Sequence, residues 1–144
     1  MPEKKTLRRA RRDKRQGKSA STQAGEFVRE EMEHIREGKH GARSAKQAIA
    51  IGLSKARRAG VKLATPKKGS KTVRKKAEHD LEKGASHRTP SRKRSQATTR
   101  ALKREGQAAA SPKALSRQTH ATAAKRTRAQ RSASAKKAAR TRAR

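Results

Sequence analysis

The amino-acid sequence predicts a mostly α-helical protein, in which a short helical hairpin carries a largely disordered, partly helix-prone basic tail. The 144-residue chain contains 43 Lys and Arg but only 11 Asp and Glu, which gives a net charge of +32. Leu, Ile, Val and Phe together number only 13, and eight of them lie between Phe27 and Leu63. So few large apolar side chains cannot offset the entropy lost on ordering the whole chain. A packed core is therefore expected in one short segment only.

Charge and apolar content divide the chain into three segments. Residues 1–18 have a net charge of +7 and are predicted to be a disordered basic N-terminal arm. Residues 19–63 have a net charge of +4 and contain the apolar residues, so the small helical hairpin is expected there. Residues 64–144 have a net charge of +21, are rich in Ala, Lys and Arg, and are predicted to form a disordered tail.

The first helix of the hairpin is expected at about residues 22–37. Its apolar residues recur at helical spacing, about 100° per residue, and form one stripe: Ala24, Val28, Met32 and Ile35. An exposed acidic ridge is expected on the opposite side of the helix: Glu26, Glu30, Glu33 and Glu37. Glycines 38 and 41 indicate where the helix stops.

The second helix is expected at about residues 45–59. Ser44 and Gln47 have the spacing of a capping box, and Gly60 suits the position after the last turn. The inner stripe consists of small and apolar residues: Ala45, Ile49, Gly52, Leu53 and Ala56. Gly52 in this stripe allows another helix to approach closely. Ile51 lies off the stripe and is either a tolerated exposed residue or part of a self-association surface, which would make a homodimer through the hairpin.

One helix is also encoded locally in the tail. Ser111 is a suitable N-cap, and Pro112 suits the first helical position of a segment that runs to residue 132. Leu115 is the one large apolar residue of that segment, so the helix is expected to fray in isolation.

The sequence argues against catalysis, cofactors and metals. It contains no cysteine, which excludes thiol catalysis and Cys-ligated zinc. The five histidines have no i, i+4 pairing and no obvious cluster of carboxylates, so we expect them to be solvated rather than metal ligands. The segment QGKS at 16–19 ends like a phosphate-binding loop, but Arg12 stands where the first glycine belongs. We therefore expect no enzyme and no cofactor.

No membrane segment or leader is expected either. No stretch approaches 18 apolar residues, and the basic start of the chain lacks the apolar region of a secretory signal. The chain also lacks the Leu, Trp and Phe face of a helix that lies on a membrane. We expect a cytoplasmic protein whose partner is a polyanion.

Dense basic runs indicate that this polyanion is a nucleic acid. Lys and Arg that neutralise phosphates release counterions and give affinity without sequence preference. With one Phe and no Tyr or Trp, the chain lacks the aromatic platforms that stack single-stranded bases, which favours duplex DNA. Ser/Thr-Pro steps followed by cations, in TPKK (65–68), TPSRKR (89–94) and SPKA (111–114), suit a narrow minor groove, although proline also simply punctuates basic linkers. The candidate DNA-binding residues are Arg8, Arg9, Arg11, Arg12, Lys67, Lys68, Arg74, Lys75, Lys76, Arg92, Lys93 and Arg94.

Two resemblances accompany these features. Residues 64–144, with TPKK, SPKA and AKKAAR elements, resemble the tails of linker-histone-like proteins, including the bacterial histone H1-like group. The segment KQAIAI-x-LS-x-AR-x-AG, matched from Lys46 to Gly60, is similar to a small bacterial domain family of unknown function. The resemblances imply a bacterial, cytoplasmic, nucleoid-associated protein and no particular chemistry.

Two functions from different classes remain open at this point. The leading one is non-sequence-specific binding of double-stranded DNA. The alternative is a protein-interaction adaptor, in which the hairpin binds a partner protein and the basic tail contacts RNA or the ribosome. The acidic ridge motivates the alternative, because four acids on one helix do not suit a DNA-facing surface; the ridge would bind a partner or the chain's own tail.

Overall fold

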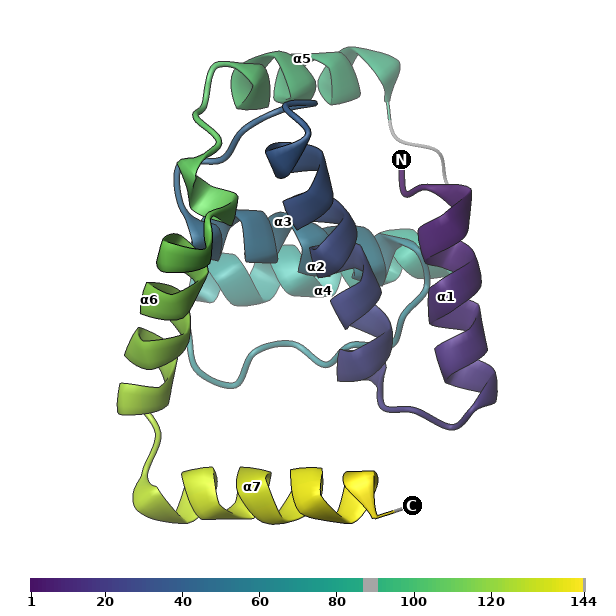
Figure 1. The fold of residues 1–144 in the computed structure, drawn as a ribbon. Coiled ribbons are helices and arrows are strands. Elements are labelled where there is room, and N and C mark those ends of the chain that lie inside the picture. Colours follow the sequence, from purple (N-terminus) through teal and green to yellow (C-terminus); the bar gives the residue numbers. More distant parts are fainter. Residues whose placement is uncertain (87–90, 144) are drawn as a thin grey trace.

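The computed structural model describes residues 1–86 and 91–143, and every regular element among them is helical (Figure 1). The predicted α class is therefore confirmed. In chain order the elements are α1 (Lys4–Arg15), α2 (Ala20–Arg36), α3 (Ala45–Arg58), α4 (Lys71–Ala85), α5 (Arg92–Lys103), the 3-10 helix η1 (Ala108–Ala110), α6 (Pro112–Ala124) and α7 (Arg128–Arg142).

The helices α2 and α3 form the predicted hairpin. The Ser44 hydroxyl accepts a hydrogen bond from the backbone N–H of Gln47 at 3.2 Å, as the cap requires. The side-chain oxygen of Gln47 accepts instead from the N–H of Arg43 at 2.7 Å, one residue before the position used in a capping box. Gly38 and Gly60 follow the ends of the two helices with positive φ angles of 72° and 86°. Local chemistry thus defines both helices within two residues.

The two helices cross closely at Gly52. A Cβ atom at this position would lie 2.7 Å from Cα of Val28, well inside ordinary van der Waals contact. The prediction that Gly52 permits close approach of a helix is therefore confirmed.

Two small clusters of apolar side chains stabilise the fold. One cluster gathers at the C-terminal end of α2 and includes Ala109, Ala110 and Leu115 from beyond the hairpin. The other lies at the opposite end of the hairpin, where Ala10 of α1 packs near Phe27. Both clusters therefore need residues from outside the hairpin.

The expected disorder of the arm and the tail is wrong for the described residues. The arm forms α1, whose Ala10 is buried, and the tail forms helices from α4 onward. For α1, α4 and η1 the physical reason is that alanines, of which the chain has 27, bury small surfaces that a count of large apolar residues overlooks; among the described helices, α5, α6 and α7 have no buried residue. Backbone bonds add to this, because Gly41 N–H donates to Leu102 O at 2.9 Å and Ala42 N–H to Gly106 O at 3.1 Å.

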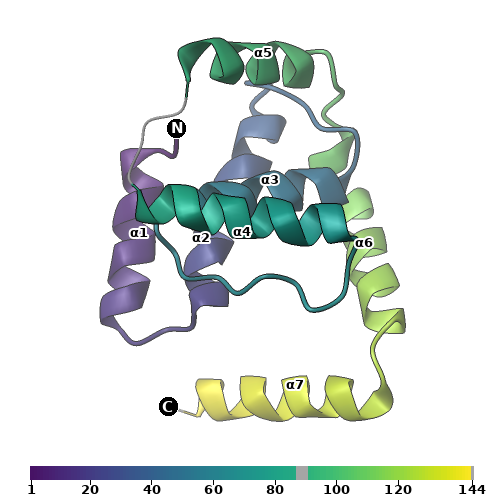
Figure 2. The same ribbon diagram turned by 180° about the vertical axis from the view of Figure 1, so that it is seen from behind.

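Helix α3 lies between α2 and α4 (Figures 1 and 2). On the α4 side, buried Asp80 accepts from the Ser54 hydroxyl at 2.6 Å and from Nε of Arg58 at 2.7 Å. Ile51 precedes Ser54 by three residues and so shares the face that α4 covers. Ile51 is half-buried rather than exposed, so the interpretation of it as a tolerated exposed residue is wrong. The self-association surface and the homodimer through the hairpin stay predictions.

The last elements extend from this body. The tail helix begins at Pro112 as predicted but ends at Ala124, and α7 begins anew after the cap residue Thr127. Helix α7 crosses one end of the molecule and α5 the other (Figure 1). Every described residue of α7 is exposed. Among the described residues, no helix combines the length and apolarity that crossing a bilayer requires.

Candidate functional site

The predicted cations of the N-terminal arm lie on α1. Arg8, Arg11 and Arg12 are exposed and free to contact a ligand. Arg9 is not, because it is half-buried and its guanidinium lies 3.7 Å from the carboxylate of Glu26 on α2. The structure therefore assigns Arg9 to the contact between α1 and α2.

A cationic groove lies along α1. It has a volume of about 460 Å³ and is lined by Leu7 together with four cations: Lys4, Arg8, Arg11 and Arg15. These cations follow one another at intervals of three or four residues, so they share one face of the helix. Sequence reasoning missed Lys4 and Arg15, although this spacing is visible once residues 4–15 are known to be helical.

The other predicted cations are exposed but dispersed. They come from the loop before α4, from α4 and from the start of α5: Lys67, Lys68, Arg74, Lys75, Lys76, Arg92, Lys93 and Arg94. Helices α1, α4 and α5 lie on different sides of the molecule (Figures 1 and 2). The structure therefore does not join these residues into one compact site.

The three Ser/Thr-Pro elements have different surroundings. TPKK lies in the loop between α3 and α4, with Thr65 and Pro66 half-buried. SPKA is a helix start, because the Ser111 hydroxyl accepts from the N–H of Ala114 at 3.2 Å. The TPSRKR element falls partly outside the described residues, since Thr89 and Pro90 belong to that gap. The elements are therefore not repeats of one local structure.

Helix α7 is a cationic element that the candidate residues did not include. It contains no acid and has six exposed cations: Arg128, Arg131, Lys136, Lys137, Arg140 and Arg142. The basic run at 135–144 was the available signal for this helix.

Most of the acids, in contrast, are buried or form ion pairs within the fold. Asp13, Glu30, Glu31 and Asp80 are buried, each at most 3% exposed. Among the described residues, no Lys or Arg after Arg58 forms an ion pair. Positive charge therefore remains on the surface, while most of the negative charge is buried or paired; Glu78 and Glu82 on α4 stay exposed.

The acidic ridge is not the exposed surface that the sequence predicts. Glu30 is only 3% exposed, and its carboxylate accepts from the backbone N–H of Glu3 at 3.0 Å. Glu26 pairs with Arg9, as described above. Half of the ridge thus binds the chain's own N-terminal helix, and only Glu33 and Glu37 stay on the surface, where Arg29 and Lys39 pair with them.

A cluster of acids and histidines lies where α2 ends. Glu31 is fully buried, and its Oε1 lies 3.2 Å from Nε2 of His40. Nε2 of His34 lies 2.8 Å from the carboxylate of Glu3. The expectation that the histidines lack neighbouring carboxylates is therefore wrong. The signal for part of the cluster was the Glu31-x-x-His34 spacing, which places both side chains on one helix face.

Two groups at this end have shifted pKa values. The hydrogen bond from His34, and then contacts with Lys39, lower the pKa of Glu3 below its usual 4.5. The hydrogen bonds of Lys39 with Glu37 and then with Glu3 raise the pKa of that ammonium above 10.5. Both shifts favour the charged forms, so Glu3 and Lys39 remain an ion pair at neutral pH.

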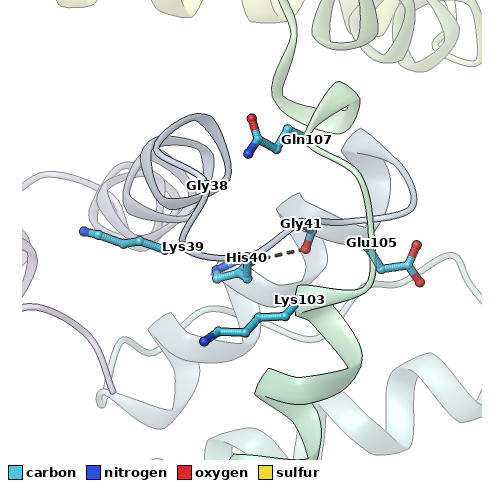
Figure 3. A pocket seen from close by; sticks show the side chains of 7 residues that line it. All are labelled: Gly38, Lys39, His40, Gly41, Lys103, Glu105 and Gln107. Carbon is cyan, nitrogen blue, oxygen red and sulfur yellow. Dashed lines mark hydrogen bonds between the residues drawn. The ribbon is translucent and has the colours of Figure 1, made fainter.

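An open pocket reaches this cluster from the solvent. Figure 3 shows it between the loop Gly38–Gly41 and the segment that follows α5, with His40 on its wall. Its volume is about 400 Å³, and Lys39, Lys103 and Glu105 also line it. The Nδ1 atom of His40 lies 3.2 Å from the carbonyl oxygen of Gly41 (Figure 3).

Comparisons with known proteins give a family match, over part of the chain, and no function. No curated protein and no solved structure matches the chain. The family match covers the last turn of α1, the hairpin and nearly all of the loop before α4. It supports the resemblance to a small uncharacterised domain family, whereas the likeness of the tail to histones remains a sequence-based expectation. Residues 11–69 match the model of a family that is described as a family of unknown function (DUF6496).

Proposed function

We propose that this chain binds double-stranded DNA without sequence preference, as a histone-like protein of the bacterial nucleoid. The observation that supports the proposal is the separation of charge: most acids are buried or paired, with Glu78 and Glu82 of α4 as exposed exceptions, and the cations of the tail remain exposed. A net charge of +32 on 144 residues opposes compact folding and calls for a polyanion.

The two cationic helices α1 and α7 provide the main contacts in this proposal. An α-helix of 15 residues such as α7 is about 22 Å long, at 1.5 Å per residue. This length spans less than one turn of duplex DNA, which is about 34 Å. Cations all around α7 suit phosphates on both sides of a groove, whereas base readout needs a defined face of donors and acceptors. The hairpin is then a scaffold, and the contacts carry no sequence information.

Salt dependence of binding to a duplex tests the proposal. The affinity of the full chain, free of any tag, is measured by fluorescence anisotropy at several salt concentrations. Each neutralised phosphate contributes about −0.9 to the slope of log K against log salt concentration. Replacing the four groove cations Lys4, Arg8, Arg11 and Arg15 by Gln is expected to reduce the slope by about 3 to 4. A salt-insensitive affinity contradicts the proposal.

A matched control separates the proposed contacts from total charge. Lys46 and Lys62 are exposed cations of the hairpin segment, and their replacement by Gln also removes positive charge. We expect this pair to change the slope by less than about 1, because neither lies on α1 or α7. An equal loss per charge in both variants contradicts a role for particular helices.

The same binding experiment also tests the alternative function, a protein-interaction adaptor. Its motivation was a free acidic ridge, and Glu26 and Glu30 of that ridge contact the chain's own N-terminal segment. Single-stranded DNA and duplex RNA serve as further ligands. Tighter binding to RNA than to duplex DNA contradicts the proposal and favours the adaptor with an RNA-directed tail.

A further inference from the structure

We propose that Glu31, His34 and His40 form a binding site for one divalent transition-metal ion of the zinc class. One carboxylate oxygen and one nitrogen from each ring lie within 4.8 Å of one another. This inference does not depend on DNA binding, because none of the three residues belongs to the proposed DNA-binding surfaces.

The chain brings these donors together at the end of one helix. Glu31 and His34 are three residues apart on α2 and so project from the same face. The reversal of the chain after Gly38 returns His40 to that face. Carboxylate and imidazole donors at i, i+3 spacing are a known way to place metal ligands on a helix. The third ligand then ties the following loop to the helix.

The surroundings of His40 leave one ring nitrogen for a cation. The carbonyl oxygen of Gly41 lies 3.2 Å from Nδ1 and only accepts hydrogen bonds, so Nδ1 carries a proton. In a neutral ring, Nε2 then directs a lone pair at Glu31 Oε1, 3.2 Å away. Two acceptors facing each other are unfavourable unless a proton or a metal ion lies between them. A metal ion between these two atoms satisfies both.

The Glu31 carboxylate also lacks a hydrogen-bond partner, although Lys55 pairs with one of its oxygens. Its side chain is 0% exposed, and neither carboxylate oxygen has a partner with hydrogen-bond geometry. Nζ of Lys55 lies 2.5 Å from Oε2, so it contributes charge on that side, while Oε1 remains directed at His40. Lys55 also lies 3.5 Å from Glu30, so one ammonium faces two buried carboxylates. Buried charge without compensation is costly, and a divalent cation compensates it.

The donor set defines the class of metal. Two imidazoles and one carboxylate suit Zn²⁺, Co²⁺ and related ions, whereas Mg²⁺ and Ca²⁺ prefer oxygen donors. In tetrahedral geometry, donors about 2.1 Å from an ion lie about 3.4 Å apart, so the side chains must converge by up to about 1.4 Å. His34 and His40 are 13% and 12% exposed, and His40 borders the solvent-open pocket, which provides an access route (Figure 3).

Glu3 is a positioning residue in this proposal. Its carboxylate lies 2.8 Å from Nε2 of His34 and accepts the proton of that nitrogen, which orients the ring. Such outer-shell contacts typically change metal affinity by about 10-fold to 100-fold. A bound ion therefore links the N-terminal segment, the end of α2 and the loop at residues 38–41.

Titration of the untagged full chain with Co²⁺ tests the site. Nucleic acid is first removed with nuclease and high salt, and metal is removed with EDTA, which is then dialysed away. We expect visible Co²⁺ absorption bands that saturate at one equivalent, are lost on addition of Zn²⁺ and persist in excess Mg²⁺. His34→Gln and His40→Gln are each expected to weaken Co²⁺ binding about tenfold or more, with unchanged circular dichroism.

A control variant and a measurement on the unmodified chain keep the test decisive. His79 and His120 are exposed on other helices, and the double variant H79Q/H120Q is expected to bind Co²⁺ like the original chain. In the original chain, Zn²⁺ should shift the imidazole NMR signals of His34 and His40 and leave those of His79 and His120 in place. No saturation at one equivalent, or equal losses in the control variant, overturns the proposal.

Discussion

Replacing Gly52 by Ala tests how closely the two hairpin helices cross. An added Cβ would lie 2.7 Å from Cα and 2.9 Å from the backbone nitrogen of Val28, where ordinary contacts begin at 3.4 Å. The helices must therefore separate by about 0.5 to 0.7 Å, and overpacking of this kind costs about 1–3 kcal/mol. Alanine is also the better helix former by about 1 kcal/mol, which opposes that loss. We expect Gly52→Ala to lower the free energy of unfolding by up to about 2 kcal/mol.

Gly25→Ala is the matched control, because Gly25 lies in α2 and a Cβ there meets nothing within 4 Å. Only the helix-propensity gain applies, so this variant is expected to be more stable by up to about 1 kcal/mol. The two substitutions are chemically identical, but their effects on the free energy of unfolding should have opposite signs. The two variants should differ in this free energy by about 1–3 kcal/mol.

Urea unfolding followed by circular dichroism measures both variants under the same conditions. The urea midpoints are compared only where the slopes of the free energy of unfolding against urea concentration are equal. A shifted midpoint then reports a change in stability and not a change in the unfolded state. If Gly52→Ala stabilises the chain as much as Gly25→Ala does, the close contact with Val28 is refuted.

Three further substitutions probe contacts that the sequence did not reveal. Asp80→Ala removes the buried acceptor of Ser54 and Arg58 and should cost about 2 kcal/mol in urea unfolding, whereas Glu82→Ala on the exposed side of α4 should cost less than about 0.5 kcal/mol. Leu115→Ala removes a partly buried side chain from the first apolar cluster and should cost about 1–2 kcal/mol; no change would mean that α6 is not docked in solution. The contacts of Glu3 with His34 and Lys39 lower its pKa below 4.5. Their contribution to the free energy of unfolding is therefore present above pH 4.5 and is lost as the pH falls through the lowered pKa. Glu3→Gln should therefore reduce the acid sensitivity of the urea midpoint, measured in EDTA, and an unchanged pH profile contradicts the contact with His34.

The hairpin was predictable because its signals are local. The apolar spacing from Ala24 to Ile35 and the cap at Ser44 specify two helices without reference to the rest of the chain. The basic surface was predictable for a similar reason, since charge is additive along a sequence and solvated cations need no partner.

The docking of the arm and the tail was not predictable by the same means. The alanines at 109 and 110 are weakly apolar, and they become buried only because Arg36 and the loop near Gly41 hold that segment through hydrogen bonds. Local sequence does not reveal such pairings, because the partners are more than 60 residues apart.

By itself, the sequence determined the helical class, the hairpin and a surplus of surface cations, because periodicity, capping and net charge are properties of short segments and of composition. Only the tertiary structure decided which acids are buried, that Arg9 pairs with Glu26 between α1 and α2, and that Glu31, His34 and His40 lie close together. Those outcomes depend on how α1 and the 38–41 loop fold back onto α2, and on how α4 packs against α3. Burial and proximity are properties of such contacts between segments, and no single segment encodes them.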